Sequence, residues 1–511
     1  MGLNMYLKET YSQTKSMNLI CINITQGMEE VVASIDYFER DTELQGESYR
    51  TAKNYMSQIF SPLSKGIIYL CEELIRQNDK YPKEFKVQVS TTDVIEDEVL
   101  QQIQEIDRLK LDIEKLSIKT PELKMIYIIF DNIKQKLQRK LEKLYEFNSF
   151  SSSNYDVAFE LASTILQGLT QVQNGKGFNT KTRTFNTKGM DLSWVEKLDE
   201  IHYTEKAKEL YGTYLEKHPE NLERIVTIIK YEEENPEYVK QTNNFLMPLE
   251  LEDTIEIKYL IYIAEEPYRT LALKHLHKFR IASTKSEGRF DPRWNNIKFN
   301  IEEDRNNPRG KYYTFFHEIG HAIDYYSGKE SGMKGYYSDK FTIDGKTLND
   351  HMYEDVENNI RMELEKELKS SDYENLDSGQ KKEMINNVTD NLLNQNKHYM
   401  NLTQDEIKLQ RTIRITYNKK LSGADNECAS DIYGGVTNHM IRGTYGHNKY
   451  YWINKKGKRV NEPSLEGFAE YYGRVMAPIG RKRDAGLKSI EKFLPASKQY
   501  MDDMIESMVR R

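Results

Sequence analysis

The stretch Thr314-Phe-Phe-His-Glu-Ile-Gly-His-Ala-Ile-Asp-Tyr-Tyr326 decides the fold of the C-terminal half of this chain. His317 and His321 are four residues apart, so on a helix both imidazoles project from one face, the spacing that two ligands of one zinc ion require. Glu318 can accept a proton from a water molecule that the metal activates, and Gly320 would let another backbone approach closely. The stretch predicts a buried helix with a zinc peptidase site; two ordinary core histidines are the alternative.

A third metal ligand must come from elsewhere, because a catalytic zinc ion takes three protein ligands and keeps one position for water. Glu427 is followed four residues later by Asp431, and Glu466 is followed four residues later by Glu470. In each pair the first acid could bind the metal while the second, one helical turn later, accepts a hydrogen bond from a ligand histidine. Spacing leaves both alternatives open.

Composition narrows the class of protein. The chain has 511 residues, enough for several domains, and its net charge of -7 gives no reason to expect a nucleic-acid partner. Cys21, Cys71 and Cys428 are too far apart in sequence to predict a disulfide framework or a metal site. The N-terminus lacks the pattern of a cleaved signal peptide, and no run approaches the ~18 apolar residues of a transmembrane segment. These features alone predict a cytoplasmic protein.

The first third of the chain has the apolar spacing of long helices. Apolar residues recur at helical intervals over 7–38, 59–74 and 99–144, with an interruption at Pro121. We expect an elongated bundle whose helices bury these stripes against each other, and a spacer or coiled coil is the alternative. The predicted domains are a helical domain at 1–189, a helical connector at 190–250 and a catalytic domain at 251–511.

Three other segments allow local predictions. Residues 289–301 contain a half-buried strand, which we expect at the sheet edge where zinc peptidases pair with an extended substrate. Residues 255–263 fit a strand or a helix equally well. Residues 348–421 are charged and helical, and are expected to form a solvated excursion.

The segment between the first two predicted helices carries a resemblance. It contains Leu44-Gln45-Gly46, then Ser48-Tyr49 and Ala52-Lys53-Asn54-Tyr55, with long helices on either side. This pattern resembles the LXG domain of polymorphic toxins that type VII secretion systems export. The resemblance implies pairing with small helical WXG-like partners and secretion without a cleaved signal peptide, to act in or on a target cell. An immunity protein that binds the C-terminal domain would then protect the producing cell.

The C-terminal half carries further resemblances. His-Glu-Ile-Gly-His-Ala-Ile-Asp at 317–324 and Glu-Gly-Phe-Ala-Glu at 466–470 are similar to the anthrax lethal factor-like peptidases of the gluzincin group. Asn-Glu-Cys-Ala-Ser-Asp at 426–431 resembles the thermolysin-type NExxSD pattern instead. The segments at 430–438 and 443–452 are similar to lethal factor-like domains of toxins and of phage minor head proteins.

The lethal factor resemblance implies roles for single residues. It favours Glu466 over Glu427 as the third zinc ligand. Glu470 and Asp431 would then contact the ligand side chains without binding the metal themselves. Such peptidases also use a tyrosine upstream of the glutamate as a donor to the oxyanion. That donor is expected among three residues, namely Tyr445, the nearest motif match, and its competitors His447 and Tyr451.

Together these features predict a mostly α protein with an N-terminal elongated helical bundle followed by an α+β zincin-type metallopeptidase domain. The expected function is that of a secreted toxin that uses one Zn2+ ion to hydrolyse peptide bonds of a protein target. A prophage minor head protein with a structural or maturation peptidase-like domain is the alternative.

Overall fold

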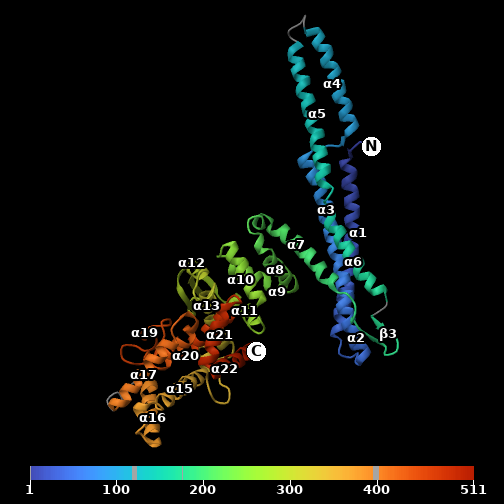
Figure 1. Cartoon of the computed structure of the whole chain (residues 1–511). Helices are drawn as coiled ribbons and strands as arrows, with labels where there is room; N and C mark the ends of the chain where they lie inside the picture. Colours follow the sequence, from blue (N-terminus) through green and yellow to red (C-terminus); the bar gives the residue numbers. More distant parts are fainter. Residues whose placement is uncertain (1, 118–122, 175–176, 395–401, 511) are drawn as a thin grey trace. The chain divides into compact units, whose positions relative to one another are not determined.

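The computed structural model describes residues 2–510 except 118–122, 175–176 and 395–401 (Figure 1). It confirms a mostly helical chain with a helical N-terminal region and little sheet. The chain divides into two compact units, Met1–Tyr214 and Leu215–Arg511, here called the N-terminal and C-terminal units. Within the described ranges, none of the helices combines the length and apolar composition that a membrane crossing needs.

The N-terminal unit is built from long helices and two very short antiparallel strand pairs, β1 with β2 and β3 with β4. Its helices are α1 (Leu7–Arg40), α2 (Glu47–Tyr55), α3 (Ser61–Gln88), α4 (Glu96–Ser117), α5 (Leu123–Ser151), α6 (Asp156–Gln173) and α7 (Ser193–Leu215), with a π-helical turn at Met56–Phe60. Its strands are β1 (Asn4–Met5), β2 (Val94–Ile95), β3 (Phe178–Asn179) and β4 (Thr184–Phe185). Figure 1 shows α4 beside α5 and α1 beside α3. The predicted interruption at Pro121 lies outside the described residues.

Two apolar clusters hold this unit together. One surrounds the fully buried Phe85 and joins the ends of α3 and α5 to the β1–β2 pair. The other joins α3 and α6 to Trp194 and Leu198 of α7. Residues 193–214 therefore pack with the N-terminal unit, whereas α8 and α9 belong to the C-terminal unit. The segment predicted as a connector at 190–250 is thus divided between the two units.

The Leu44-Gln45-Gly46 segment forms the turn between α1 and α2. Gly46 has a φ of 108°, a conformation that glycine adopts at little cost. The Lys53 ammonium donates hydrogen bonds to the backbone carbonyls of Asp41 and Leu44, which fixes the turn against α2.

Two helices of the N-terminal unit expose rows of large apolar side chains. On α1, Leu19 and Ile20 are 55% and 59% exposed, and Ile24 and Val31 extend the face of Ile20 at helical spacing. On α5 the exposed members are Met125, Ile126, Ile128, Ile129 and Ile133. We call these two rows the apolar stripes of the N-terminal unit.

In the C-terminal unit, many helices surround a small sheet. The first helices of this unit are α8 (Leu222–Glu234), α9 (Pro236–Leu246), α10 (Leu251–Ile263), α11 (Tyr268–His275), α12 (Ile301–Arg305) and α13 (Tyr313–Glu330), which carries His317 and His321. The later helices are α14 (Tyr337–Lys340), α15 (Leu348–Glu367), α16 (Ser378–Asn394), α17 (Gln404–Lys420), α18 (Glu427–Val436), α19 (Lys449–Trp452), α20 (Pro463–Met476), α21 (Arg481–Phe493) and α22 (Pro495–Arg510). The strands are β5 (Arg280–Ser283), β6 (Lys285–Asp291) and β7 (Asn296–Asn300).

The three strands lie in the order β5-β7-β6. Strand β7 runs parallel to β5 and antiparallel to β6, with Phe290 opposite Ile297. The strand predicted within 289–301 is confirmed as β7, but its predicted place at the sheet edge is wrong because β5 and β6 flank it. Strands β5 and β6 form the two edges of this sheet.

Two other local predictions are settled by burial. Residues 255–263 lie in helix α10, where Ile255, Ile257 and Ile261 are all buried, so the helical period is hidden by burial on several sides. The solvated excursion predicted for 348–421 is wrong, because α15, α16 and α17 each bury apolar side chains, among them Val388 of α16 and Ile413 of α17. The buried face of α15 consists of Leu348, Met352, Val356, Ile360 and Leu364, all fully buried. Charged neighbours on the outer face masked this stripe in the sequence.

Candidate metal centre

The helices that carry the predicted ligands, α13 and α20, pack directly against each other. A Cβ atom on Gly320 would lie 3.0 Å from the Cα atom of Ala469, and one on Gly473 would lie 3.0 Å from the backbone N of His317. Glycine at these two positions lets the backbones approach this closely, which confirms the expectation for Gly320. The crossing brings Glu466 of α20 to the histidines of α13.

His317, His321 and Glu466 form a compact group of metal-binding side chains. Glu466 Oε2 lies 3.5 Å from His317 Nε2, and Glu466 Oε1 lies 3.5 Å from His321 Nε2. The centroids of the two imidazole rings are 4.7 Å apart. One ligand atom from each of the three residues lies within 4.8 Å of the others, so the group could hold a metal ion.

The chemistry of these donors fits a divalent cation. Among the described residues, the buried Glu466 Oε2 has no hydrogen-bond partner, an arrangement that costs free energy unless a positive charge compensates it. Burial lowers the pKa of His321, but the Glu466 carboxylate outweighs it and raises that pKa to about 9. Burial would raise the pKa of Glu466, but the histidines, His321 most strongly, hold it below its usual range. Two imidazoles and one carboxylate are a ligand set that zinc accepts with one position left open.

Glu318 faces the edge strand β6. A Cβ atom on Gly288 would lie 2.8 Å from Glu318 Oε1, and the backbone N–H of Phe290 favours the charged carboxylate and so opposes the rise of its pKa. Within the described part of the chain, Glu318 Oε2 has no hydrogen-bond partner. Burial raises the pKa of Glu318 to about 8, and the nearby Glu466 carboxylate adds to the rise. The Glu318 carboxylate is thus buried beside strand β6, with one oxygen left without a hydrogen-bond partner among the described residues.

Glu427, the alternative third ligand, is engaged in an ion pair. The Arg309 guanidinium donates hydrogen bonds of 3.0 Å to both carboxylate oxygens of Glu427. Burial raises the pKa of Glu427 to about 7, although Arg309 opposes the rise. The groups of described residues that could hold a metal ion do not include Glu427.

Glu470 lies beside the other ring nitrogen of His317. Its Oε1 atom is 3.9 Å from His317 Nδ1, and its Oε2 atom accepts a hydrogen bond from the Tyr313 hydroxyl. Tyr313 precedes His317 by four residues, so both project from the same face of α13. A carboxylate in this place can orient the imidazole electrostatically.

Asp431 and His447 form a second polar group next to Glu466. Asp431 Oδ2 lies 2.6 Å from His447 Nδ1, and Asp431 Oδ1 accepts a hydrogen bond of 2.7 Å from the His447 backbone N–H. Burial opposes protonation of His447, but the hydrogen bond to Asp431 raises its pKa to about 9. The His447 ring stacks on Tyr451 with centroids 3.7 Å apart, and the Tyr451 hydroxyl donates to Glu466.

Tyr445 lies apart from this group. Its side chain is 39% exposed, and its backbone carbonyl accepts a hydrogen bond from the Ser430 hydroxyl. Among the described residues, no hydrogen bond joins the Tyr445 hydroxyl to the metal-binding side chains. The structure brings His447 and Tyr451 to the site and leaves the predicted oxyanion role of Tyr445 without geometric support.

Sequence reasoning missed two groups of residues at this site. Tyr313 could have been found, because it lies one helical turn before His317 on the predicted helix. Arg309 and the β6 backbone at Gly288 and Phe290 carried no motif, because their contacts arise only from tertiary packing.

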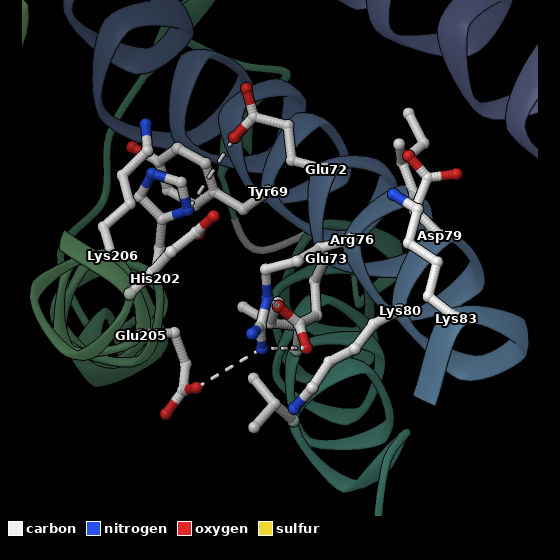
Figure 2. Close-up of a pocket in the computed structure, with 14 residues that line it drawn as sticks. Tyr69, Glu72, Glu73, Arg76, Asp79, Lys80, Lys83, His202, Glu205 and Lys206 are labelled. Atoms are coloured by element: carbon white, nitrogen blue, oxygen red, sulfur yellow. Dashed lines mark hydrogen bonds and ion pairs between the residues drawn. The ribbon is translucent and has the colours of Figure 1, made fainter. Parts of the chain in front are cut away.

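A cavity of about 700 Å³ lies in the N-terminal unit, between α3, α6 and α7 (Figure 2). In it Arg76 pairs with Glu73 at 2.8 Å and with Glu205 at 3.4 Å. The ring of His202 stacks on Tyr69 with centroids 3.7 Å apart. The described lining residues carry both signs of charge and include none of the predicted site residues.

Part of this chain is similar to a known protein. Over 203 residues the chain is 50% identical to a protein named "Toxin" from Bacillus cereus, a match that covers 39% of this chain and 37% of that protein. The chain thus spans little more than a third of the length of this relative. No family model matches, and no solved structure matches.

Proposed function

We propose that the C-terminal unit is a zinc metalloendopeptidase of the gluzincin type and that the chain acts as a secreted toxin on a protein substrate. The observation that carries this proposal is the convergence of His317, His321 and Glu466 beside the buried carboxylate of Glu318. Buried ionisable groups with displaced pKa values gather at sites of chemistry more often than elsewhere.

The chain's own residues supply the proton-transfer group and the hydrogen-bond donor that peptide-bond hydrolysis needs. A zinc ion held by the two histidines and Glu466 would lower the pKa of a neighbouring water molecule and of Glu318, and would polarise a peptide carbonyl. Glu318 takes a proton from the attacking water and later gives it to the leaving amine. His447, held in place by Asp431, donates a hydrogen bond to the carbonyl oxygen as negative charge develops there.

The edge strand β6 is the surface we assign to the substrate. Its outer edge is free of the other two strands, and its inner side meets Glu318 at Gly288 and Phe290. An extended peptide that pairs with this edge would place a backbone carbonyl near Glu318. This mode of binding recognises main chain, so it favours an unfolded or loop segment of a protein substrate.

The toxin part of the proposal rests on two supports. One is the identity to the Bacillus cereus protein named "Toxin", which favours a toxin over the prophage head protein. The other is the pair of apolar stripes of the N-terminal unit, which suit association with small helical WXG-like partners during type VII export. An immunity protein for the C-terminal unit belongs to the same proposal.

Glu318→Gln tests the peptidase. The amide keeps the shape of the side chain but cannot act as a base, so loss of peptidase activity by about 10²- to 10⁴-fold and loss of toxicity in a sensitive cell are expected. Metal content should stay the same because Glu318 is not a ligand. Glu302→Gln on the exposed surface of α12 is the matched control and should stay toxic. Full toxicity of Glu318→Gln would show that the damage is not proteolytic.

A further inference from the structure

We propose that Tyr313 is a positioning residue of the metal site, held in place by Arg309 and Arg474 and acting on His317 through Glu470. The inference rests on the proposed function, because His317 is one of the proposed zinc ligands. It goes beyond that function by assigning a share of the metal affinity to a buried tyrosine that binds neither the metal nor the substrate.

The Tyr313 hydroxyl engages one oxygen of the Glu470 carboxylate. Tyr313 is fully buried, and its hydroxyl donates a hydrogen bond to Glu470 Oε2. The hydroxyl also lies 3.4 Å from the backbone carbonyl oxygen of Glu470. Because Oε2 is engaged in this way, the other carboxylate oxygen, Oε1, remains for His317 and lies 3.9 Å from its Nδ1 atom.

His317 Nδ1 is the atom that needs this carboxylate. The nitrogen is buried, and no hydrogen-bond partner for it occurs among the described residues. A proton on Nδ1 leaves the lone pair of Nε2 free for a metal ion, and a hydrogen bond from Nδ1 selects that tautomer. A movement of about 1 Å would bring Nδ1 and Glu470 Oε1 to hydrogen-bond distance.

Two arginine side chains confine the Tyr313 ring. The guanidinium carbons of Arg309 and Arg474 lie 4.6 Å and 4.7 Å from the ring centroid, within the range of cation–π attraction. Each guanidinium is fixed in turn, because Arg309 donates to both carboxylate oxygens of Glu427 and Arg474 donates to the backbone carbonyl of Arg309 at 2.5 Å. The ring therefore has little room to turn, and its hydroxyl stays on Glu470.

Loss of the hydroxyl should loosen the Glu470 carboxylate without removing a ligand. Residues that orient a metal ligand typically contribute about 10- to 100-fold to metal affinity or activity. A tyrosine that only filled space would leave the affinity unchanged when phenylalanine replaces it, because the ring is retained. The two roles therefore differ in the Kd for zinc.

Zinc affinity of the full-length chain tests the inference. The Kd is measured by competition with a chromogenic chelator, and the visible absorption spectrum of Co2+-loaded protein reports the ligand geometry. Tyr313→Phe keeps the ring against the two arginines, so its Kd for zinc should rise about 10- to 100-fold and its Co2+ spectrum should shift. Tyr326→Phe is the matched control, because Tyr326 is buried on the same helix and its hydroxyl donates to the Lys278 carbonyl and to Asn295 instead. Its Kd and spectrum should match those of wild type.

A double-mutant cycle tests the route through Glu470. If Tyr313 acts through this carboxylate, Tyr313→Phe combined with Glu470→Gln should bind zinc no more weakly than Glu470→Gln alone. Additive losses would show that Tyr313 acts by another route and would overturn the inference.

The remaining outcomes separate the inference from the proposed function. A Tyr313→Phe protein with the wild-type Kd and Co2+ spectrum overturns the inference and leaves the proposed peptidase intact, and so does an equal rise of the Kd in Tyr326→Phe. Folded wild type that binds neither ion overturns the inference and the proposed function together. Circular dichroism checks folding, and should Tyr313→Phe not fold, Arg309→Lys decides, because it keeps the hydroxyl but loosens the ring. A raised Kd in Arg309→Lys supports the inference, and an unchanged Kd overturns it.

Discussion

The two units of this chain use burial in opposite ways. The N-terminal unit leaves large apolar side chains such as Ile20 and Met125 in solvent, 59% and 71% exposed. The C-terminal unit instead withdraws carboxylates from solvent, with Glu466 and Glu470 only 1% and 2% exposed. Exposed apolar surface costs free energy until a partner covers it, and buried charge costs free energy until an opposite charge compensates it. The first unit is therefore suited to association through its surface, and the second to chemistry in its interior.

Removal of the metal should cause the largest difference in stability between the two units. A ligand present at about 1,000 times its Kd stabilises the folded state by about 4 kcal/mol, so chelation should destabilise the C-terminal unit by at least this order. Hydrogen exchange measured by mass spectrometry should accelerate in α13 and α20 and stay unchanged in α3. Equal acceleration in both units would contradict the assignment of the metal site to one of them.

Glycine substitutions give the next largest contrast. A Cβ atom on Gly473 meets the His317 backbone at 3.0 Å, so Gly473→Ala should lower the free energy of unfolding of the C-terminal unit by about 1–3 kcal/mol. A Cβ atom on Gly27 of α1 would meet no atom of the described residues within 4 Å, so Gly27→Ala should stabilise the N-terminal unit by about 0.5–1 kcal/mol. Denaturant unfolding of each variant measures both. A neutral Gly473→Ala would mean that the two helices can separate without loss.

A smaller contrast comes from two histidines whose pKa values move in opposite directions. Burial lowers the pKa of His202 in the N-terminal unit to about 3, so this unit should lose stability as pH falls from 6.5 toward 3. His447 has its pKa raised to about 9 by Asp431 against the effect of burial, so its contribution is full below pH 6.5 and is lost as pH rises through 9. Denaturant unfolding across this pH range, with His202→Phe as the variant, measures the first effect. An unchanged acid slope in His202→Phe would exclude His202 as its cause.

Polar substitution in the apolar stripes should change stability least. Ile20→Ser combined with Ile24→Ser removes exposed apolar surface, so the free energy of unfolding should stay within about 0.5 kcal/mol. Secretion from the producing cell should nevertheless fall, because the proposed helical partner would lose its contact face. Undiminished secretion of this variant would remove the assigned role of the stripe on α1.

Local sequence patterns predicted the parts of the fold that depend on neighbouring residues. The helix that carries His317 and His321, the strand β7 and the long N-terminal helices all follow from apolar spacing. The burial of helix α15 escaped prediction because its buried stripe lies among charged residues, and α10 remained ambiguous because it is buried on several sides. The apolar periodicity of a sequence identifies a helix only when one face of that helix is exposed to solvent.

The site residues that lie within sequence motifs could be predicted, and those that reach the site only through tertiary packing could not. Glu466 was favoured through a resemblance, and in the structure it lies with the two histidines. The engagement of Glu427 by Arg309 and the contact of β6 with Glu318 could not be predicted, because both join segments far apart in sequence. For the same reason spacing alone could not separate Tyr445 from Tyr451.

Glu466, and not Glu427, is the proposed third ligand of the metal site. The direct measurement is the zinc content of full-length Glu466→Ala and Glu427→Ala after dialysis against a mild chelator, with circular dichroism to confirm folding. Removal of a ligand should leave Glu466→Ala without zinc, whereas Glu427→Ala should retain about one ion per chain with at most reduced activity. A folded Glu427→Ala without zinc, beside a Glu466→Ala that keeps it, would contradict the account.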